Sequence, residues 1–252
     1  MPKTVRILYC HCSNTELVPA EAKAAVLEAL AAAGAELEAV PDLCELAARG
    51  DPALARLAQA GPLRIIACYP RTIRWLFAAA GTPLPEKGIE ILNLRADGAK
   101  KIVAKIKTRK AAAKKGKKPI AAALLKDLDA SARQLGEWIP WFPVIDRSRC
   151  KNCKQCLNFC LFGVYENAAD GSVRVAHPEN CKTGCPACAR VCPHLAIIFP
   201  KHEGGPVNGA EVAEGDLARD DMRVGLEAHS RADILAALRE RNKALASGDA
   251  SK

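Results

Sequence analysis

Hydrophobic and polar positions follow two alternating patterns over the first part of the chain. Short apolar runs predict β-strands at residues 5–10, 36–40, 63–68 and 89–94. The segments between them carry the apolar spacing of helices, at residues 19–33, 52–60 and 71–80. Asp51 is the expected N-cap of the middle helix, and Gly34 and Gly61 follow the ends of the first two helices. Strands that alternate with helices predict a parallel α/β sheet with right-handed crossovers.

The pattern changes in the second half of the chain, where apolar segments are short and stand beside cysteines. One such segment, 161–165, follows Cys160, and another, 193–199, follows Cys192. Val173 and Val175 alternate with polar neighbours, which is typical of a hairpin strand. These short elements predict a small α+β domain.

The two patterns divide the chain into four predicted parts. An α/β domain occupies 1–96, and the small α+β domain occupies 138–202. The segment 97–137 between them is interpreted as a basic linker followed by a helix. After residue 202 the chain becomes rich in glycine, so we expect a flexible segment at 203–252 with one C-terminal amphipathic helix.

Composition and charge narrow the class of protein. No run of about eighteen apolar residues occurs, so we expect no membrane span. Residues 1–5 show no secretory signal, which predicts a cytoplasmic protein with reduced thiols. The formal net charge is +9, and residues 97–126 hold eleven basic residues against one acidic residue. Three interpretations of that segment are open: a solvated linker, a docking site for an acidic partner, or a contact with nucleic acid. The segment has no aromatic residues on which bases could stack, so nucleic acid is the least expected of the three.

Eight of the twelve cysteines form two closely spaced blocks: Cys150, Cys153, Cys156 and Cys160, then Cys181, Cys185, Cys188 and Cys192. Four thiolates at this spacing suit the iron corners of a [4Fe–4S] cube, whose sulfurs accept hydrogen bonds from the loop amides. Zinc sites more often use two separated cysteine pairs, and disulfides do not suit a reduced compartment. The second block also has the spacing of radical S-adenosylmethionine enzymes, but too few residues follow it for the barrel of those enzymes.

Residues 139–200, with these two blocks, resemble the bacterial dicluster ferredoxins. The resemblance implies that the fourth cysteine of each block binds the other cube. One cube would then take Cys150, Cys153, Cys156 and Cys192, and the other would take Cys160, Cys181, Cys185 and Cys188. Two features depart from the family: one extra residue between Cys181 and Cys185, and Leu161 in place of a proline. The extra residue changes the surroundings of a cube and removes no ligand.

The other four cysteines stand at the ends of predicted strands. Cys10 and Cys12 end the first strand, Cys44 follows the second, and Cys68 ends the third. Open α/β sheets place their sites at this carboxyl edge. If the strand order is 2-1-3-4, neighbouring strands about 4.8 Å apart bring the four cysteines within reach of one small cluster. Otherwise they are buried packing residues; His11 is either a further ligand or a side chain on the opposite face.

Residues 1–95 also resemble the N-terminal domain of the flavin-containing subunit of heterodisulfide reductase, through short motifs at 9–12, 67–71 and 93–95. The resemblance implies an iron–sulfur or thiol site in an electron-transfer assembly. Arg71 and Arg95, in these motifs, either offset the charge of a cluster or are plain surface charges. No G-x-G-x-x-G occurs, so we expect neither FAD nor NAD on this chain. Flavin or hydride chemistry would belong to a partner, either flavin-containing or heterodisulfide-reductase-like.

The main functional hypothesis is therefore an electron-transfer protein that exchanges electrons with a partner oxidoreductase. It would carry two cubes, or three if the N-terminal cysteines bind one. No acid–base pair suggests turnover of its own, so we expect an electron carrier or one component of an oxidoreductase complex. The alternatives are a component of a thiol/disulfide reductase that acts at Cys10 and Cys12, and an iron–sulfur sensor that binds nucleic acid through the basic segment.

Overall fold

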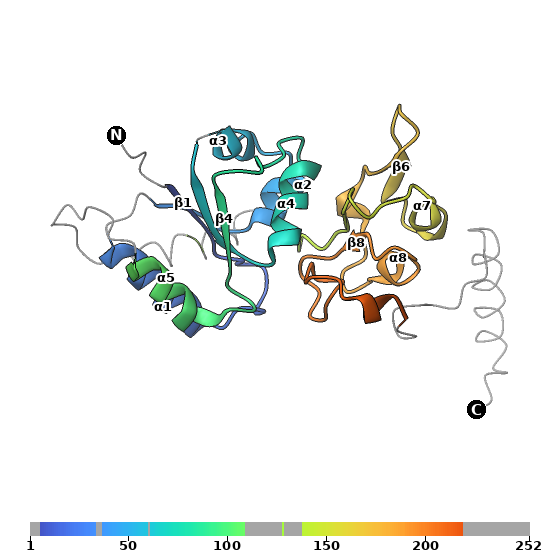
Figure 1. Ribbon diagram of the computed structural model, residues 1–252. Coiled ribbons are helices and arrows are strands. Elements are labelled where there is room, and N and C mark those ends of the chain that lie inside the picture. Colours follow the sequence, from blue (N-terminus) through green and yellow to red (C-terminus); the bar gives the residue numbers. More distant parts are fainter. Residues whose placement is uncertain (1–5, 34–36, 60, 109–127, 129–137, 219–252) are drawn as a thin grey trace.

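The first unit of the chain is a parallel α/β sheet. The computed structural model describes residues 6–33, 37–59, 61–108, 128 and 138–218 (Figure 1). Four parallel strands stand in the order β2-β1-β3-β4, which confirms the predicted parallel sheet and meets the condition under which its four cysteines lie close together. The strands span Arg6–Cys10 (β1), Leu37–Val40 (β2), Leu63–Ala67 (β3) and Ile89–Asn93 (β4).

Helices cover both faces of this sheet (Figure 1). One face carries α1 (Ala20–Ala32) and α5 (Gly98–Thr108), and the other carries α2 (Leu43–Ala48), α3 (Ala53–Gln59) and α4 (Pro70–Ala79). The side chains of successive residues in β1 point to opposite faces of the sheet, because side chains alternate along a strand. Leu8 packs in the core under α2 to α4, whereas Ile7 and Tyr9 pack in the core under α1 and α5.

Helix α5 occupies the start of the segment that was predicted to be a linker. Its Ile102 and Ile106, one turn apart, are buried in the same core as residues of α1. The start of the 97–137 segment is therefore a packed helix of the first unit rather than a solvated linker, because an i, i+4 apolar pair gives it a face to bury. The helix predicted at 121–135 lies outside the described residues except for Leu128, which is buried. The C-terminal helix predicted at 230–244 lies entirely outside them.

The second unit consists of very short elements around its own core. β5 (Val144–Ile145) pairs with β8 (Ile197–Ile198), and β6 (Tyr165–Asn167) pairs with β7 (Val173–Val175), both antiparallel. The helices are α7 (Gln155–Phe159), α8 (Ala187–Arg190), η1 (Pro178–Asn180) and η2 (Glu214–Ala218). The helices of the described chain are all too short or too polar to cross a membrane. The core of this unit includes cysteines beside aliphatic residues, so bound iron and sulfide would complete it.

The two units are packed against each other through α4. Phe142, Val144 and Ile198 of the second unit belong to the same core as the α4 side chains. The Arg71 side chain, 8% exposed, pairs with Asp146, 3% exposed, at 2.6 Å. Arg71 also donates to the carbonyl oxygen of Leu195. A buried pair and a shared apolar core fix the position of the second unit on the sheet.

The chain just after residue 202 is packed rather than flexible. Val207 and Asn208 are buried, and the Thr72 hydroxyl donates to the Asn208 carbonyl oxygen at 2.9 Å. Gly209 has a φ of +92°, and a Cβ there would lie 1.7 Å from Oγ1 of Thr72. Glycine is needed at this contact because any side chain would collide with α4. The glycines that suggested flexibility instead permit close packing.

Candidate iron–sulfur sites

Site I comprises Cys150, Cys153, Cys156 and Cys192, the four cysteines that line one pocket of the second unit. Cys150 and Cys153 lie in one loop and Cys156 lies in the first turn of α7, whereas Cys192 follows α8 in the other cysteine block. Asn152 and Lys154 have φ values of +53° and +62°, which curl the loop round the pocket. The Ala196 amide donates to Sγ of Cys192 at 3.4 Å. This is the crossed grouping that the ferredoxin resemblance implied.

Site II comprises Cys160, Cys181, Cys185 and Cys188, which line a second and wider pocket. Its volume is about 490 Å³, against about 20 Å³ at site I. The extra residue lies in the 182–184 loop on its wall, where Gly184 has a φ of +78°. Phe162, on the same wall, is 43% exposed. Site II is therefore the more open of the two pockets.

Polar contacts at these sulfurs match what a cube requires. The buried Tyr165 hydroxyl donates to Sγ of Cys188 at 3.1 Å. Burial raises the pKa of Cys156 and of Cys181 to about 12, so these thiols need a nearby cation to ionise. Iron supplies that charge, because a coordinating thiol is deprotonated by its metal. No three His, Cys, Asp or Glu among the described residues gather closely enough to bind a single metal ion; a four-iron cube holds its thiolates further apart.

The N-terminal site comprises Cys10, Cys12, Cys44 and Cys68, which line one enclosed cavity at the carboxyl edge of the sheet. Cys10 ends β1, Cys44 lies in the first turn of α2, and Cys68 follows β3. Cys12 adopts a φ of +54°, and it lines the cavity with the other three cysteines. The structure thus brings together all four cysteines that the strand pattern placed at this edge.

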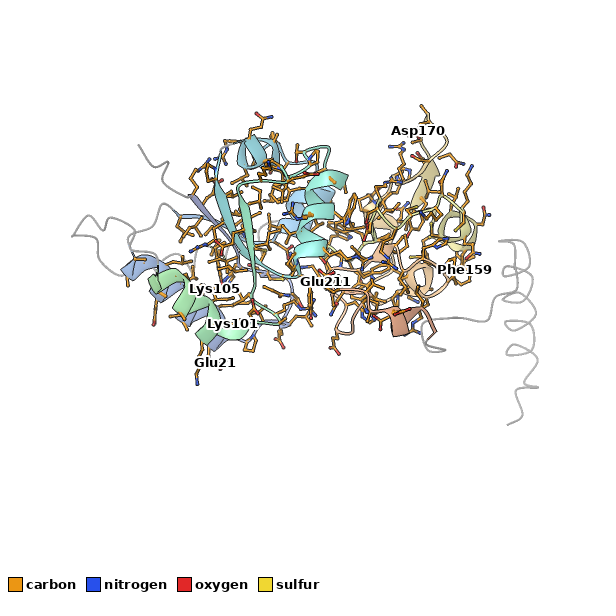
Figure 2. All side chains as sticks on the ribbon, in the orientation of Figure 1. Glu21, Lys101, Lys105, Phe159, Asp170 and Glu211 are labelled. Atoms are coloured by element: carbon orange, nitrogen blue, oxygen red, sulfur yellow. The ribbon has the colours of Figure 1, made fainter. Side chains whose placement is uncertain are left out.

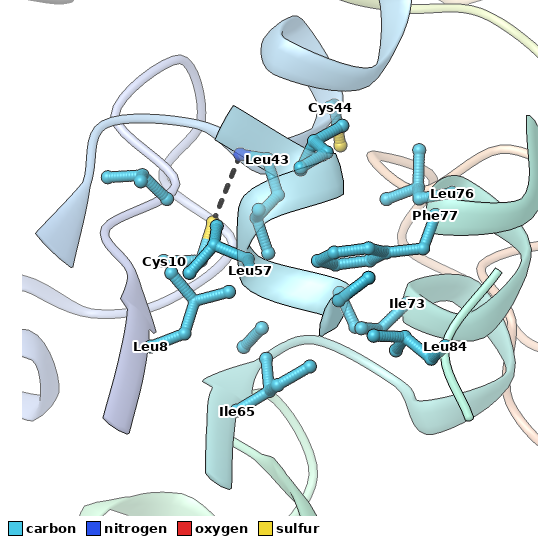
Figure 3. Packing of buried hydrophobic residues seen from close by; sticks show 14 of the residues in the cluster. Leu8, Cys10, Leu43, Cys44, Leu57, Ile65, Ile73, Leu76, Phe77 and Leu84 are labelled. Carbon is cyan, nitrogen blue, oxygen red and sulfur yellow. Dashed lines mark hydrogen bonds between the residues drawn. The ribbon is translucent and has the colours of Figure 1, made fainter. Parts of the chain in front are cut away.

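Local hydrogen bonds position two of these sulfurs (Figure 3). Asp42 is the N-cap of α2, and its Oδ1 accepts from the Cys44 amide at 2.9 Å. The preceding amide, of Leu43, donates to Sγ of Cys10 at 3.4 Å, the bond drawn dashed in Figure 3. The start of α2 thereby holds Cys44 and Cys10 on adjacent sides of one cavity. An amide that donates to sulfur is also the contact that tunes iron–sulfur clusters.

The four cysteines of the N-terminal site differ in how readily their thiols ionise. Burial raises the pKa of Cys44 well above its ordinary value and that of Cys68 to about 12. A hydrogen bond with Cys12, together with burial, raises the pKa of Cys10. The same bond lowers the pKa of Cys12, and the charge of Lys201 assists it against the effect of burial. Cys12 is thus the thiol of this set that ionises most readily.

Two charged residues of the N-terminal site were missed by the sequence analysis. Lys201 lines the cavity and binds Asp42, 159 positions away in the chain. No local pattern signals such a pair, because it depends on how the second unit docks on the sheet. Asp42 had a weak signal, since an aspartate before a short apolar stretch is a common N-cap.

The other predicted residues have different roles. The His11 ring contacts the Tyr9 hydroxyl at 3.3 Å, on the core side of α1, and does not line the cavity. Arg95 lines the cavity, lies 5.2 Å over the Tyr69 ring and donates to the Pro200 carbonyl. Arg71 binds the second unit instead. Of the two arginines, Arg95 is the one placed to offset charge at the cysteines.

Comparison with known proteins defines the class of the second unit. Residues 142–210 match the family model of the 4Fe-4S dicluster domain. The chain is 49% identical over 63 residues to an uncharacterised ferredoxin of Methanocaldococcus jannaschii, covering 25% of this chain and 42% of that protein. It is 36% identical over 74 residues to Ferredoxin-3 of Nostoc sp., covering 22% of this chain and 75% of that ferredoxin. The chain is therefore an iron–sulfur electron-transfer protein, and it belongs to the ferredoxin family.

A third relative points toward a larger assembly. The chain is 29% identical over 84 residues to pyruvate synthase subunit PorD of Methanocaldococcus jannaschii, covering 33% of this chain and 95% of that protein. No solved structure matches the chain significantly. The matched family model covers only the second unit, so the resemblance of residues 1–95 to a heterodisulfide reductase domain stays a prediction.

Proposed function

We propose that this chain relays electrons to or from a partner oxidoreductase through three [4Fe–4S] cubes. Sites I and II would each hold one cube, and the N-terminal site would hold the third. The observation that carries the proposal is that three separate pockets are each lined by four cysteines. Four thiolates in one pocket are the ligand set that a [4Fe–4S] cube requires.

The N-terminal cavity supports the third cube by comparison with site I. Both cavities are small, with about 20 Å³ of free volume, and both are lined by four cysteines, among mostly apolar residues at the N-terminal site and among mostly polar residues at site I. At each site a backbone amide donates to a cysteine sulfur at 3.4 Å, from Leu43 in one and Ala196 in the other. Similar enclosure and similar sulfur contacts favour a similar occupant.

The proposed partner is a multi-subunit oxidoreductase, flavin-containing or similar to heterodisulfide reductase. The relative named as a pyruvate synthase component supports a role beside a larger enzyme. Site II is the proposed contact, because its pocket is wide and apolar and Phe162 stands exposed on its wall. Cys181 of site II also packs against the apolar core that the two units share. Site II is therefore in contact both with the open pocket and with the core beside the sheet. The sequence lacks a dinucleotide fingerprint, so the partner would supply hydride chemistry.

Electron paramagnetic resonance of the fully reduced protein tests the three-cube proposal. The wild-type chain should show about three unpaired spins, one for each reduced cube. The variant Cys68→Ala should lose the N-terminal signal and keep the other two. Cys153→Ala is the matched control, because it alters site I alone. Two spins in the wild-type chain, unchanged in Cys68→Ala, would contradict a third cube.

A second candidate function, thiol/disulfide reduction, is favoured by the contact between Cys10 and Cys12. The Cys12 thiolate would attack a substrate disulfide and displace one thiol. Cys10 would then resolve the mixed disulfide, releasing the second thiol and leaving a Cys10–Cys12 disulfide. Two electrons, one from each ferredoxin cube, and two protons would restore the pair. A partner-free assay of heterodisulfide reduction with a low-potential donor tests this, and a rate unaffected by Cys12→Ala would exclude it.

A further inference from the structure

A lysine of the second unit reaches into the N-terminal site. Lys201 and Pro200, which follow β8, line the same cavity as the four N-terminal cysteines. The Lys201 side chain is 4% exposed, and its Nζ lies 2.5 Å from Oδ2 of Asp42, whose side chain is 0% exposed. The ammonium group is therefore fixed in position and shielded from water.

The surrounding groups keep this lysine charged. Burial alone opposes its charge, but the Asp42 carboxylate, which contacts Nζ, favours the charged form and helps to raise the pKa of Lys201 above its ordinary value. A charge in a buried position acts more strongly on its neighbours than one in water, because the effective dielectric constant there is lower. Lys201 is thus a strong local cation beside the cysteines.

Other charges at the cavity add to that of Lys201. Arg95 lines the cavity together with the four cysteines. Lys23, also buried, donates to the Cys12 carbonyl at 3.2 Å. The carboxylate of Asp42, which pairs with Lys201, carries a negative charge that opposes these positive charges. At site I, by contrast, neither lining lysine is buried: Lys151 is exposed and Lys154 is half-buried, so solvent and salt screen their charges more strongly.

We infer that Lys201 raises the reduction potential of an iron–sulfur cube at the N-terminal site, and so favours electron transfer toward that site from the second unit. The inference rests on the proposed third cube. One-electron reduction adds one negative charge and breaks no bond, so a fixed cation stabilises the reduced state more than the oxidised state. The negative charge of Asp42 lowers the reduction potential, but the three positive charges of Lys201, Arg95 and Lys23 outweigh it.

This arrangement makes the N-terminal potential depend on contact between the units. The four cysteines belong to the first unit, whereas the ammonium group that acts on them follows the last strand of the second unit. Docking is secured separately by the buried pair of Arg71 and Asp146. The second unit therefore both supplies electrons and sets how readily the first unit accepts them.

Redox titrations followed by electron paramagnetic resonance test the inference on the full chain. Lys201→Gln should lower the midpoint potential of the N-terminal cube by about 59 mV or more, a tenfold change in the one-electron equilibrium constant, and leave the other two unchanged. Lys201→Arg, which keeps the charge, should restore most of the shift. Lys101→Gln is the matched control, because Lys101 lies on α5 far from the cysteines in the sequence (Figure 2). Its side chain is 62% exposed and pairs with Asp97.

A second variant keeps the inference falsifiable if Lys201→Gln loses its cube. Asp42→Asn keeps an oxygen acceptor for the Cys44 amide and removes the opposing charge, so it should raise the N-terminal potential. Unchanged potentials in the variants that hold about twelve irons per chain would overturn the inference and leave the three-cube proposal intact. About eight irons in the wild-type chain would overturn the three-cube proposal, and the inference with it.

Discussion

The two units of this chain gather cysteines in opposite ways. In the second unit, each site draws three cysteines from one closely spaced block and the fourth from the other block, among elements of two to five residues. In the first unit, the four cysteines come from three separate strand ends of a sheet that has its own apolar cores. The second unit thus depends on its clusters for a core, whereas the first unit forms a cavity with or without one. The comparison contrasts clusters that complete the core of their unit with a proposed cluster in a cavity that the sheet forms by itself.

Removal of iron should have the largest effect and should divide the two units. Because the core of the second unit contains its cysteines, the iron-free chain should lose structure there. The sheet should persist, since Leu8, Ile65 and Ile66 are fully buried among apolar neighbours. Hydrogen exchange should show lost protection at β5 to β8 and retained protection at β1 and β3. Equal loss in both units would contradict the comparison.

Loss of one ferredoxin ligand should have the next largest effect. Cys153→Ala should remove or convert the cube at site I, so iron per chain should fall by about four, or by about one if three irons stay. Metal analysis together with electron paramagnetic resonance measures both results. Unchanged iron and unchanged spectra would refute the ligand assignment.

Loss of the Arg71–Asp146 pair, which joins the two units, should have the third largest effect. Arg71→Met leaves the Asp146 carboxylate buried without its cation, so the free energy of unfolding should fall by about 3–5 kcal/mol. Anaerobic denaturant unfolding, followed by tryptophan fluorescence, measures this change. Arg174→Met is the control, because its pair with Glu166 lies on the surface and should matter little. Equal effects of the two variants would show that the interface pair does not hold the units together.

The smallest expected effect concerns a single hydroxyl group at site II. Tyr165→Phe removes the hydrogen bond to Sγ of Cys188, which stabilises negative charge on the sulfur. The potential of the site II cube should therefore fall slightly while the iron content stays the same. A redox titration measures the change, and a shift at site I instead would reassign the crossed ligands.

The sequence predicted the parts of this molecule that depend on local pattern. Strand and helix periodicity predicted the parallel sheet, and cysteine spacing predicted the dicluster domain, whereas the strand order entered only as a condition. Contacts between distant segments were not predictable in this way. The Lys201–Asp42 pair and the Gly209–Thr72 contact arise only when the second unit docks on α4. The composition of helix α5, which is dominated by lysine, predicts a linker, but two buried isoleucines determine its packing.

Iron and acid-labile sulfide per chain, measured on anaerobically purified protein, test the central claim most directly. The account predicts about twelve irons and about twelve sulfides, with about four of each lost in Cys68→Ala. About eight of each in the wild-type chain, unchanged in that variant, would contradict a third cube. The N-terminal cysteines would then be free thiols or packing residues of the sheet.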